Sequence, residues 1–281
     1  MASRVAAAGF ELTVWNRTPG RAREFAAQAG ARAADTPAAA VRGADVVITC
    51  LSTSHNVAAL LDGPDGILAG LRRGALFVDC TSGDPSTSAR IAERLAEFGV
   101  AFIDAPVSGG TSGAEKGILT VMVGGEAAAL ERARPVLESF GRKIVHCGAV
   151  GAGDAVKAMN NAMLAIHVWS TGECLAALSR AGVDPKVALD VINASSGRSN
   201  TSENLFPERV LSRRFPRTFR LALLDKDIGI AAQVAREQKI ASPVLQLTAE
   251  LFRMAHAELG EDADHVEAVR VIERLGDTEI K

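Results

Sequence analysis

The chain has 281 residues, of which 48% are hydrophobic and 23% are charged, and its formal net charge is −2. This length suffices for two domains with separate cores, and the composition is that of a soluble globular protein. The balanced charge argues against a nucleic-acid or membrane surface, and no apolar run reaches transmembrane length. The first residues show no signal-peptide pattern, so we expect a cytoplasmic protein.

The cysteines and histidines give no sign of a metal site. The four cysteines form no CxxC pair, and the five histidines form no HExxH-like pair. Free thiols in a reducing compartment are the simplest interpretation. Any chemistry must therefore come from other side chains or from a bound organic cofactor.

The first half of the chain alternates apolar runs with amphipathic stretches. Helices are expected at 18–30, 84–99 and 126–141, with proline or polar residues at their starts and glycine at their ends. Because strands and helices alternate, a parallel, doubly wound sheet is predicted. The expected strands lie at 10–16, 44–52, 74–82, 100–108, 119–125 and 143–149.

The second half changes character near Gly148–Gly153. From there on the sequence shows almost no strand pattern, and helices are expected at 151–182, 184–197, 221–240 and 242–260. We therefore predict two domains: an α/β, Rossmann-like domain at 1–150 and an all-helical domain at 151–281 for substrate binding and dimerisation.

The stretch Asn16-Arg17-Thr18 ends the first expected strand and precedes a helix that starts at Pro19. In a dinucleotide-binding unit this position faces the adenosine ribose, where an arginine accommodates the 2′-phosphate of NADP. Arg17 can pair with a phosphate, and Thr18 can add a hydroxyl. A solvated arginine before a helix explains the same residues.

The segment Ser108-Gly109-Gly110 follows another strand end and Pro106. Two glycines expose consecutive backbone N–H groups, which suits a carboxylate, and Ser108 can donate from its hydroxyl. A glycine turn that only reverses the chain is the alternative.

Lys157 and Asn161 are four residues apart, so on a helix they share one face. Partial burial and the positive helix end would both favour the neutral amine of Lys157. Such a lysine can exchange a proton with an alcohol or carbonyl oxygen, while Asn161 binds the same substrate. A lysine that extends its amine to solvent at a helix start is the alternative.

Together these segments resemble the β-hydroxyacid dehydrogenase family, which includes 3-hydroxyisobutyrate dehydrogenase and tartronate semialdehyde reductase. The resemblance spans essentially the whole chain. Its most specific motifs are "DAPVSGG", "GAGDAVKAMNN" and "LLDKDIGIA", and "ASSGRS" is also familial.

The resemblance implies a role for each matching residue. Lys157 would be the catalytic acid/base, and Asn161 with Ser108, Gly109 and Gly110 would hold a small carboxylate substrate. The cofactor would be NADP, with NAD possible, and hydride would pass between it and a β-hydroxy acid or its semialdehyde. Family members assemble through the helix at 153–181, so a homodimer or homotetramer is expected. Besides Asn16, Arg17 and Thr18, the cofactor contacts would be Leu51, Ser52, Asn56, Ser82 and Lys226.

The start of the chain departs from the family pattern. Members open with a strand and a G-x-G-x-x-G loop, whereas residues 1–9 resemble the later part of the helix that follows that loop. Either Met1 is an internal methionine of a longer chain, which we favour, or the protein is a truncated relative. The upstream reading frame is expected to encode roughly 15–20 further residues with that strand and loop. Without them we expect weak cofactor binding.

Two other functions remain open from sequence alone. Imine reductases share the strand end at Asn16–Thr18 and the two-domain plan, but they usually replace the lysine that matches Lys157. A non-catalytic relative that keeps the fold, with a cofactor site impaired by the missing segment, is the other alternative.

Overall fold

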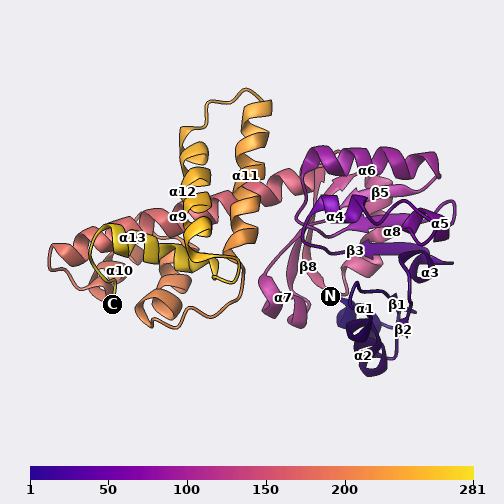
Figure 1. Ribbon diagram of the computed structural model, residues 1–281, viewed down its shortest axis with the longest axis horizontal. Coiled ribbons are helices and arrows are strands. Elements are labelled where there is room, and N and C mark those ends of the chain that lie inside the picture. Colours follow the sequence, from indigo (N-terminus) through magenta and orange to yellow (C-terminus); the bar gives the residue numbers. More distant parts are fainter. The chain divides into compact units, whose positions relative to one another are not determined.

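The computed structural model describes all 281 residues and divides the chain into two compact units, Met1–Lys157 and Ala158–Lys281 (Figure 1). The division falls inside the long helix α9 (Ala152–Arg180), a few residues beyond the boundary expected at 150. An α/β unit followed by an all-helical unit confirms the predicted fold class.

The first unit is built on a six-stranded sheet in the order β3-β4-β5-β7-β6, with β8 also paired to β7. The central strands β3 (Val46–Thr49), β4 (Leu76–Asp79) and β5 (Ala101–Asp104) run parallel. All four residues of β4 are buried, as expected for an apolar strand covered on both faces.

Helices cover the two faces of this sheet. Phe77 of β4 packs in one cluster with Ile91 of α6 (Pro85–Glu97), whereas its neighbour Val78 packs in another with Leu130 of α8 (Ala127–Leu137). Because successive side chains of a strand point to opposite faces, α6 and α8 lie on opposite sides. The sheet is therefore doubly wound, as predicted.

The directions of two strands differ from the prediction of an all-parallel sheet. β7 (Leu119–Gly125) runs antiparallel to β5 and to the short β6 (Val107–Ser108). The connection from β5 to β7 turns back on itself through the glycines after Ser108 and the short helix α7 (Gly110–Lys116) instead of crossing over the sheet. β8 (Gly141–Gly148) then pairs parallel with β7.

The N-terminal residues form a separate small layer of the first unit. β1 (Thr13–Val14) pairs with β2 (Arg32–Ala33) in a two-stranded parallel sheet, near α1 (Ala2–Ala7) and α2 (Pro19–Ala29) (Figure 1). β1 pairs only with β2, and β3 pairs only with β4. β1 is therefore an edge strand of the small sheet, and β3 is an edge strand of the main sheet. The remaining helices of this unit are α3 (Pro37–Val41), α4 (Ser54–Ala58) and α5 (Ile67–Gly70).

The second unit is entirely helical. Its core gathers large side chains such as Trp169 of α9, Phe206 and Phe252. Residues 198–220, for which the sequence predicted no element, contain a π-helix, η1 (Thr201–Leu211), with Pro207 inside it. No helix of the chain combines the length and apolarity needed to cross a bilayer. The other elements are α10 (Pro185–Asn193), α11 (Leu221–Glu237), α12 (Pro243–Leu259), η2 (His265–Ala268) and α13 (Val269–Leu275).

Candidate active site

Three parallel strands end at one edge of the main sheet. Thr49, Asp79 and Asp104 are register partners at the carboxyl ends of β3, β4 and β5. In open α/β sheets, ligands bind outside the carboxyl ends of the parallel strands. Of the predicted residues, Leu51 and Ser52 follow the end of β3, Ser82 follows the end of β4, and Asn16–Thr18 follow β1.

The loops after β3 and β4 are joined by hydrogen bonds. Thr49 Oγ1 donates to Asp79 Oδ1 at 2.8 Å, and the Leu51 N–H donates to Thr81 Oγ1 at 3.0 Å. The loop of Leu51 and Ser52 therefore lies beside the loop of Ser82. Ser52 is exposed, so a polar side chain faces solvent at this edge.

Asn56 lies in the first turn of α4, which begins after the Ser52 loop. Thr53 caps this helix by accepting from the Asn56 N–H at 3.1 Å, and its hydroxyl donates to Asn56 Oδ1 at 2.8 Å. The Asn56 side chain is exposed, and its amide nitrogen keeps its donors for a ligand.

Asn16, Arg17 and Thr18 follow β1 and are all exposed. Asn16 Oδ1 accepts from the Thr18 N–H at 2.9 Å, a local turn that shapes the backbone before α2. Arg17 forms no ion pair within the chain, and its guanidinium can therefore reach an external anion. The residues that the sequence predicts at the adenosine end of a dinucleotide are therefore exposed polar groups, as are Ser52 and Asn56. No G-x-G-x-x-G segment occurs among residues 1–281 to hold the pyrophosphate.

The turn at Ser108–Gly110 has the backbone that its glycines predict. Gly109 has φ 134° and Gly110 has φ 64°, values that side chains rarely allow. A Cβ on Gly109 would approach Leu119 to 2.9 Å, so the turn is also tightly packed. Ser108 pairs with Thr120 in the sheet, and the N–H groups of the first turn of α7 have no partner within that helix.

Lys157 stands on a helix that is fastened to the end of β5. Asp104 accepts hydrogen bonds from the N–H groups of Gly151, at 2.7 Å, and of Asp154, at 2.9 Å. A carboxylate at this position complements the helix dipole of α9. Lys157 lies one turn further along and is 9% exposed. The start of α9 is therefore hydrogen-bonded to the carboxyl end of β5, the strand that precedes β6 and the Ser108–Gly110 turn.

Asn161 and Lys226 belong to the second unit, where one buried carboxylate holds both. Asn161 Nδ2 donates to Asp227 Oδ2 at 2.5 Å, and Lys226 Nζ lies 2.9 Å from Asp227 Oδ1. Asp227 is 2% exposed. Sequence reasoning missed its role, although the aspartate stands within the "LLDKDIGIA" motif.

Three buried aspartates of the first unit were also missed. Burial raises the pKa values of Asp79 and Asp104, while hydrogen bonds from neighbouring groups oppose that rise. Burial and the nearby Asp104 raise the pKa of Asp154 to about 8. Asp79 and Asp104 end apolar strands, and Asp104 and Asp154 lie within the motifs "DAPVSGG" and "GAGDAVKAMNN". These two features of the sequence could have identified them.

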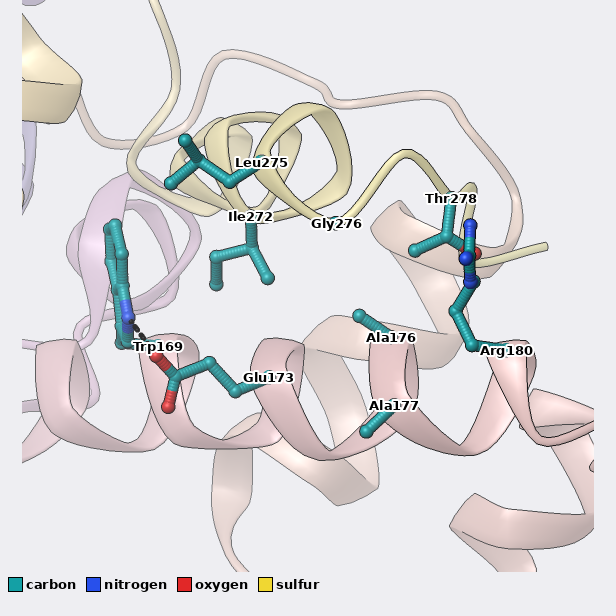
Figure 2. Close-up of a pocket in the computed structure, with 9 residues that line it drawn as sticks. All are labelled: Trp169, Glu173, Ala176, Ala177, Arg180, Ile272, Leu275, Gly276 and Thr278. Atoms are coloured by element: carbon teal, nitrogen blue, oxygen red, sulfur yellow. Dashed lines mark hydrogen bonds between the residues drawn. The ribbon is translucent and has the colours of Figure 1, made fainter.

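A groove in the second unit is lined by residues of α9 and of the C-terminal segment (Figure 2). Its volume is about 340 Å³, and its floor is α9, where Trp169 Nε1 donates to Glu173 Oε1 at 2.8 Å. Trp169 follows Lys157 by twelve residues, which is about 18 Å along a helix. None of the predicted site residues lines this groove.

Comparison with known proteins covers both halves of the chain. Residues 1–148 match the family described as "NAD binding domain of 6-phosphogluconate dehydrogenase". Residues 151–272 match the family described as "NAD-binding of NADP-dependent 3-hydroxyisobutyrate dehydrogenase".

Individual relatives agree with the family matches. The chain is 37% identical to 3-hydroxyisobutyrate dehydrogenase of Pseudomonas aeruginosa over 272 residues, which cover 94% of this chain and 90% of the relative. It is also 37% identical to NAD-dependent L-serine dehydrogenase of that organism, over 90% of this chain and 87% of the relative.

Solved structures show the same relationship. 3-Hydroxyisobutyrate dehydrogenase of Mycobacterium tuberculosis, solved with L-serine, has a TM-score of 0.88 and 29% identity, and the match covers 96% of this chain and 94% of that one. An imine reductase from Myxococcus stipitatus, solved with NADP+, has a TM-score of 0.62 and 22% identity over 96% of each chain, which shows a shared fold alone. The chain belongs to the β-hydroxyacid dehydrogenase family and is an NAD(P)-dependent hydroxyacid dehydrogenase.

Proposed function

We propose that the protein transfers hydride between NADP(H) and a small 3-hydroxy acid or its semialdehyde, with Lys157 as the general acid/base. The observation that carries this proposal is the placement of Lys157. It is buried in the second turn of a helix that Asp104 fastens to β5, the strand that leads to the Ser108–Gly110 turn. No comparable observation favours imine reduction, for which only the fold is shared.

The substrate class follows from the chemistry that the named relatives share. 3-Hydroxyisobutyrate and L-serine both carry a primary alcohol next to the carbon that bears the carboxylate, and they differ at that carbon. The Ser108 hydroxyl and the N–H groups at Gly109 and Gly110 are donors for the shared carboxylate, with Asn161 as a further donor. Fixing the carboxylate also fixes which face of the alcohol carbon points toward the cofactor.

A nicotinamide cofactor, when bound, would supply the chemistry of hydride transfer from the alcohol carbon or back to the aldehyde carbon. In the oxidation direction the neutral amine of Lys157 takes the hydroxyl proton, so the product is an aldehyde and the lysine becomes an ammonium. In the reduction direction this ammonium donates the proton to the oxygen. The burial of Lys157 keeps water from competing for that proton.

For the cofactor we propose a preference for NADP, because Arg17 follows β1 with an exposed guanidinium and no ion pair. Leu51, Ser52, Asn56 and Ser82, together with Lys226 of the second unit, are the proposed further contacts. For the assembly we propose a homodimer or homotetramer, supported by the exposed apolar side chains of Met163, Val187 and Val191. For its location we propose the cytoplasm.

The decisive experiment compares the full-length protein with Lys157→Ala. Both are assayed with 3-hydroxyisobutyrate, L-serine and related hydroxy acids, each with NAD and with NADP. Loss of turnover with retained cofactor binding supports the proposal, whereas unchanged turnover removes Lys157 from the mechanism. Lys186→Ala, on the exposed surface of α10, is the matched control and is expected to leave turnover unchanged. Light scattering after gel filtration tests the assembly.

A further inference from the structure

Asp154 lies three residues before Lys157, in the first turn of α9, and is 1% exposed. Its side chain does not point along its own helix. Oδ1 accepts the Gly83 N–H at 2.9 Å, and Oδ2 lies 2.6 Å from the hydroxyl of Ser88, which is fully buried in α6. One carboxyl group therefore joins α9 to the segment that connects β4 with α6.

That connecting segment carries Ser82, the residue immediately before Gly83, and it is held from a second side. The Asp84 N–H donates to Ser54 Oγ of α4 at 2.7 Å. A Cβ on Gly83 would lie 2.5 Å from Ser54 Oγ and 2.8 Å from Asp154 Oδ2, so glycine is needed for this close approach. The position of the loop thus depends on where the Asp154 carboxyl group stands.

We propose that Asp154 is a positioning residue that locks the cofactor-side loop of Ser82 to the helix of Lys157. The proposal rests on the proposed function, which gives Ser82 a cofactor contact and Lys157 the proton transfer. A carboxyl group that holds both elements fixes the distance between the hydride and proton positions. Displacements of about 1 Å between reacting groups cost on the order of 100-fold in rate.

The charge of Asp154 matters to this role. Asp104 on β5 accepts the backbone N–H of Asp154 at 2.9 Å, Asp79 ends the neighbouring strand β4, and Lys157 lies one turn along α9. Burial and the two aspartates raise the pKa of Asp154 to about 8, so at neutral pH the acid is mostly protonated. Ionisation of Asp154 adds a further negative charge beside these two aspartates and weakens the link between the loop and α9.

The test uses the full-length protein and three variants at this link. Asp154→Asn reproduces the neutral acid, with an oxygen for Gly83 and an amide donor for Ser88, whereas Asp154→Ala removes both bonds. Ser88→Ala removes one bond without touching α9. Asp184→Ala, which removes the helix cap of α10, is the control for general destabilisation.

At pH 7 we expect Asp154→Ala to lower kcat at least roughly tenfold, with a smaller change in KM for the hydroxy acid. Asp154→Asn is expected to keep wild-type kcat at pH 7. We expect kcat of the wild type to decline above about pH 8, and kcat of Asp154→Asn not to decline there. The kcat of Ser88→Ala is expected to lie between those of Asp154→Ala and Asp154→Asn. The control Asp184→Ala is expected to keep the wild-type kcat. If Asp154→Ala keeps kcat within twofold of wild type, or Asp154→Asn is as impaired as Asp154→Ala, the proposal is wrong.

Hydrogen exchange separates this proposal from the proposed function. In Asp154→Ala, the amides of 81–84 and those of 151–157 are expected to lose protection together, while Asp154→Asn retains it. If the wild type oxidises no hydroxy acid, the proposed function fails but the exchange result still tests the link. If protection in both segments is unchanged in Asp154→Ala, the link itself is disproved, whatever the activity.

Discussion

Asn161 and Asp227, which are 66 residues apart in sequence, form a buried hydrogen bond in which 2.5 Å separates Nδ2 from Oδ2. The other carboxylate oxygen of Asp227 binds the ammonium of Lys226. A single aspartate therefore orients the residue proposed to bind substrate and the residue proposed to bind cofactor. The two roles can be separated by changing its charge and its hydrogen-bonding capacity independently.

Two substitutions of Asp227 are expected to separate its effect on Asn161 from its effect on Lys226. Asp227→Asn keeps an oxygen for the Asn161 amide but loses the charge beside Lys226, so cofactor affinity falls while KM for the hydroxy acid changes little. Asp227→Ala also leaves a buried amide unsatisfied, which costs about 1–3 kcal/mol in the free energy of unfolding and raises KM. Steady-state kinetics and urea unfolding measure both effects.

The control for this pair is Asp262→Asn, at an exposed ion pair with Arg217. Exposed pairs contribute about 0–1 kcal/mol, so stability and kinetics are expected to stay near wild type. Equal effects of Asp227→Asn and Asp227→Ala on KM would show that Asp227 does not orient Asn161.

Arg17 is expected to decide between the two cofactors. Arg17→Ala would remove the proposed charged hydrogen bond to the 2′-phosphate, a contact of about 1.5–3 kcal/mol, so KM for NADP is expected to rise roughly 10- to 100-fold. KM for NAD is expected to stay within about twofold, because NAD has no phosphate there. Equal losses with both cofactors would contradict the assigned contact. Arg21→Ala, one turn into α2, is the exposed control.

Much of the fold follows from apolar patterning. β3, β4 and β5 are short apolar runs because parallel strands are buried on both faces, and this pattern is visible without coordinates. The antiparallel direction of β7 is not visible, because a strand reads the same in both directions. The two-residue strand β2 is too short for any periodicity, and η1 contains a proline that argues against a helix.

The residues of the candidate site also differ in whether the sequence alone can predict them. Residues whose chemistry is local, such as the glycines at 109 and 110, are predictable because a positive φ favours glycine. Residues whose role depends on a distant partner are not. Asp104 ends a strand like any solvated boundary residue, and only the fold shows that it binds the start of α9.

A substitution at Gly153 tests how tightly the start of α9 is packed. A Cβ there would lie 2.3 Å from the carbonyl oxygen of Met122 and 2.8 Å from Asp104 Oδ2. Gly153→Ala is therefore expected to lower the free energy of unfolding by at least about 1–3 kcal/mol and to reduce kcat, because α9 must move. Urea unfolding and kinetics at saturating substrate measure the two effects.

Gly229→Ala is the matched control for Gly153→Ala. Gly229 lies inside α11, is exposed, and a Cβ there meets no atom within 4 Å. Alanine in a helix is favoured over glycine by up to about 1 kcal/mol, so this variant is expected to be slightly more stable than wild type. Equal stability losses in both variants would show that close packing at Gly153 is not the cause.

The buried acid at Asp154 predicts an unusual dependence of stability on pH. Its folded-state pKa of about 8 lies above the ordinary aspartate pKa of 3.8, which the unfolded chain has. Between these values the unfolded chain has released the proton that the folded protein keeps, so the contribution of Asp154 to stability falls as pH rises and levels off above about 8. The loss is at most about 1.4 kcal/mol per pH unit in this window.

Asp154→Asn cannot ionise and is expected to escape this loss. The difference in the free energy of unfolding between the variant and the wild type should therefore move in favour of the variant from pH 5 to pH 8, by at least about 1 kcal/mol, and stay constant above that range. Urea unfolding at each pH measures it. Because Asp84, a half-buried cap of α6, has a lowered pKa, Asp84→Asn is the opposite control and should change little between pH 5 and 8. A variant curve parallel to that of the wild type across the whole range would mean that Asp154 is already ionised at pH 5.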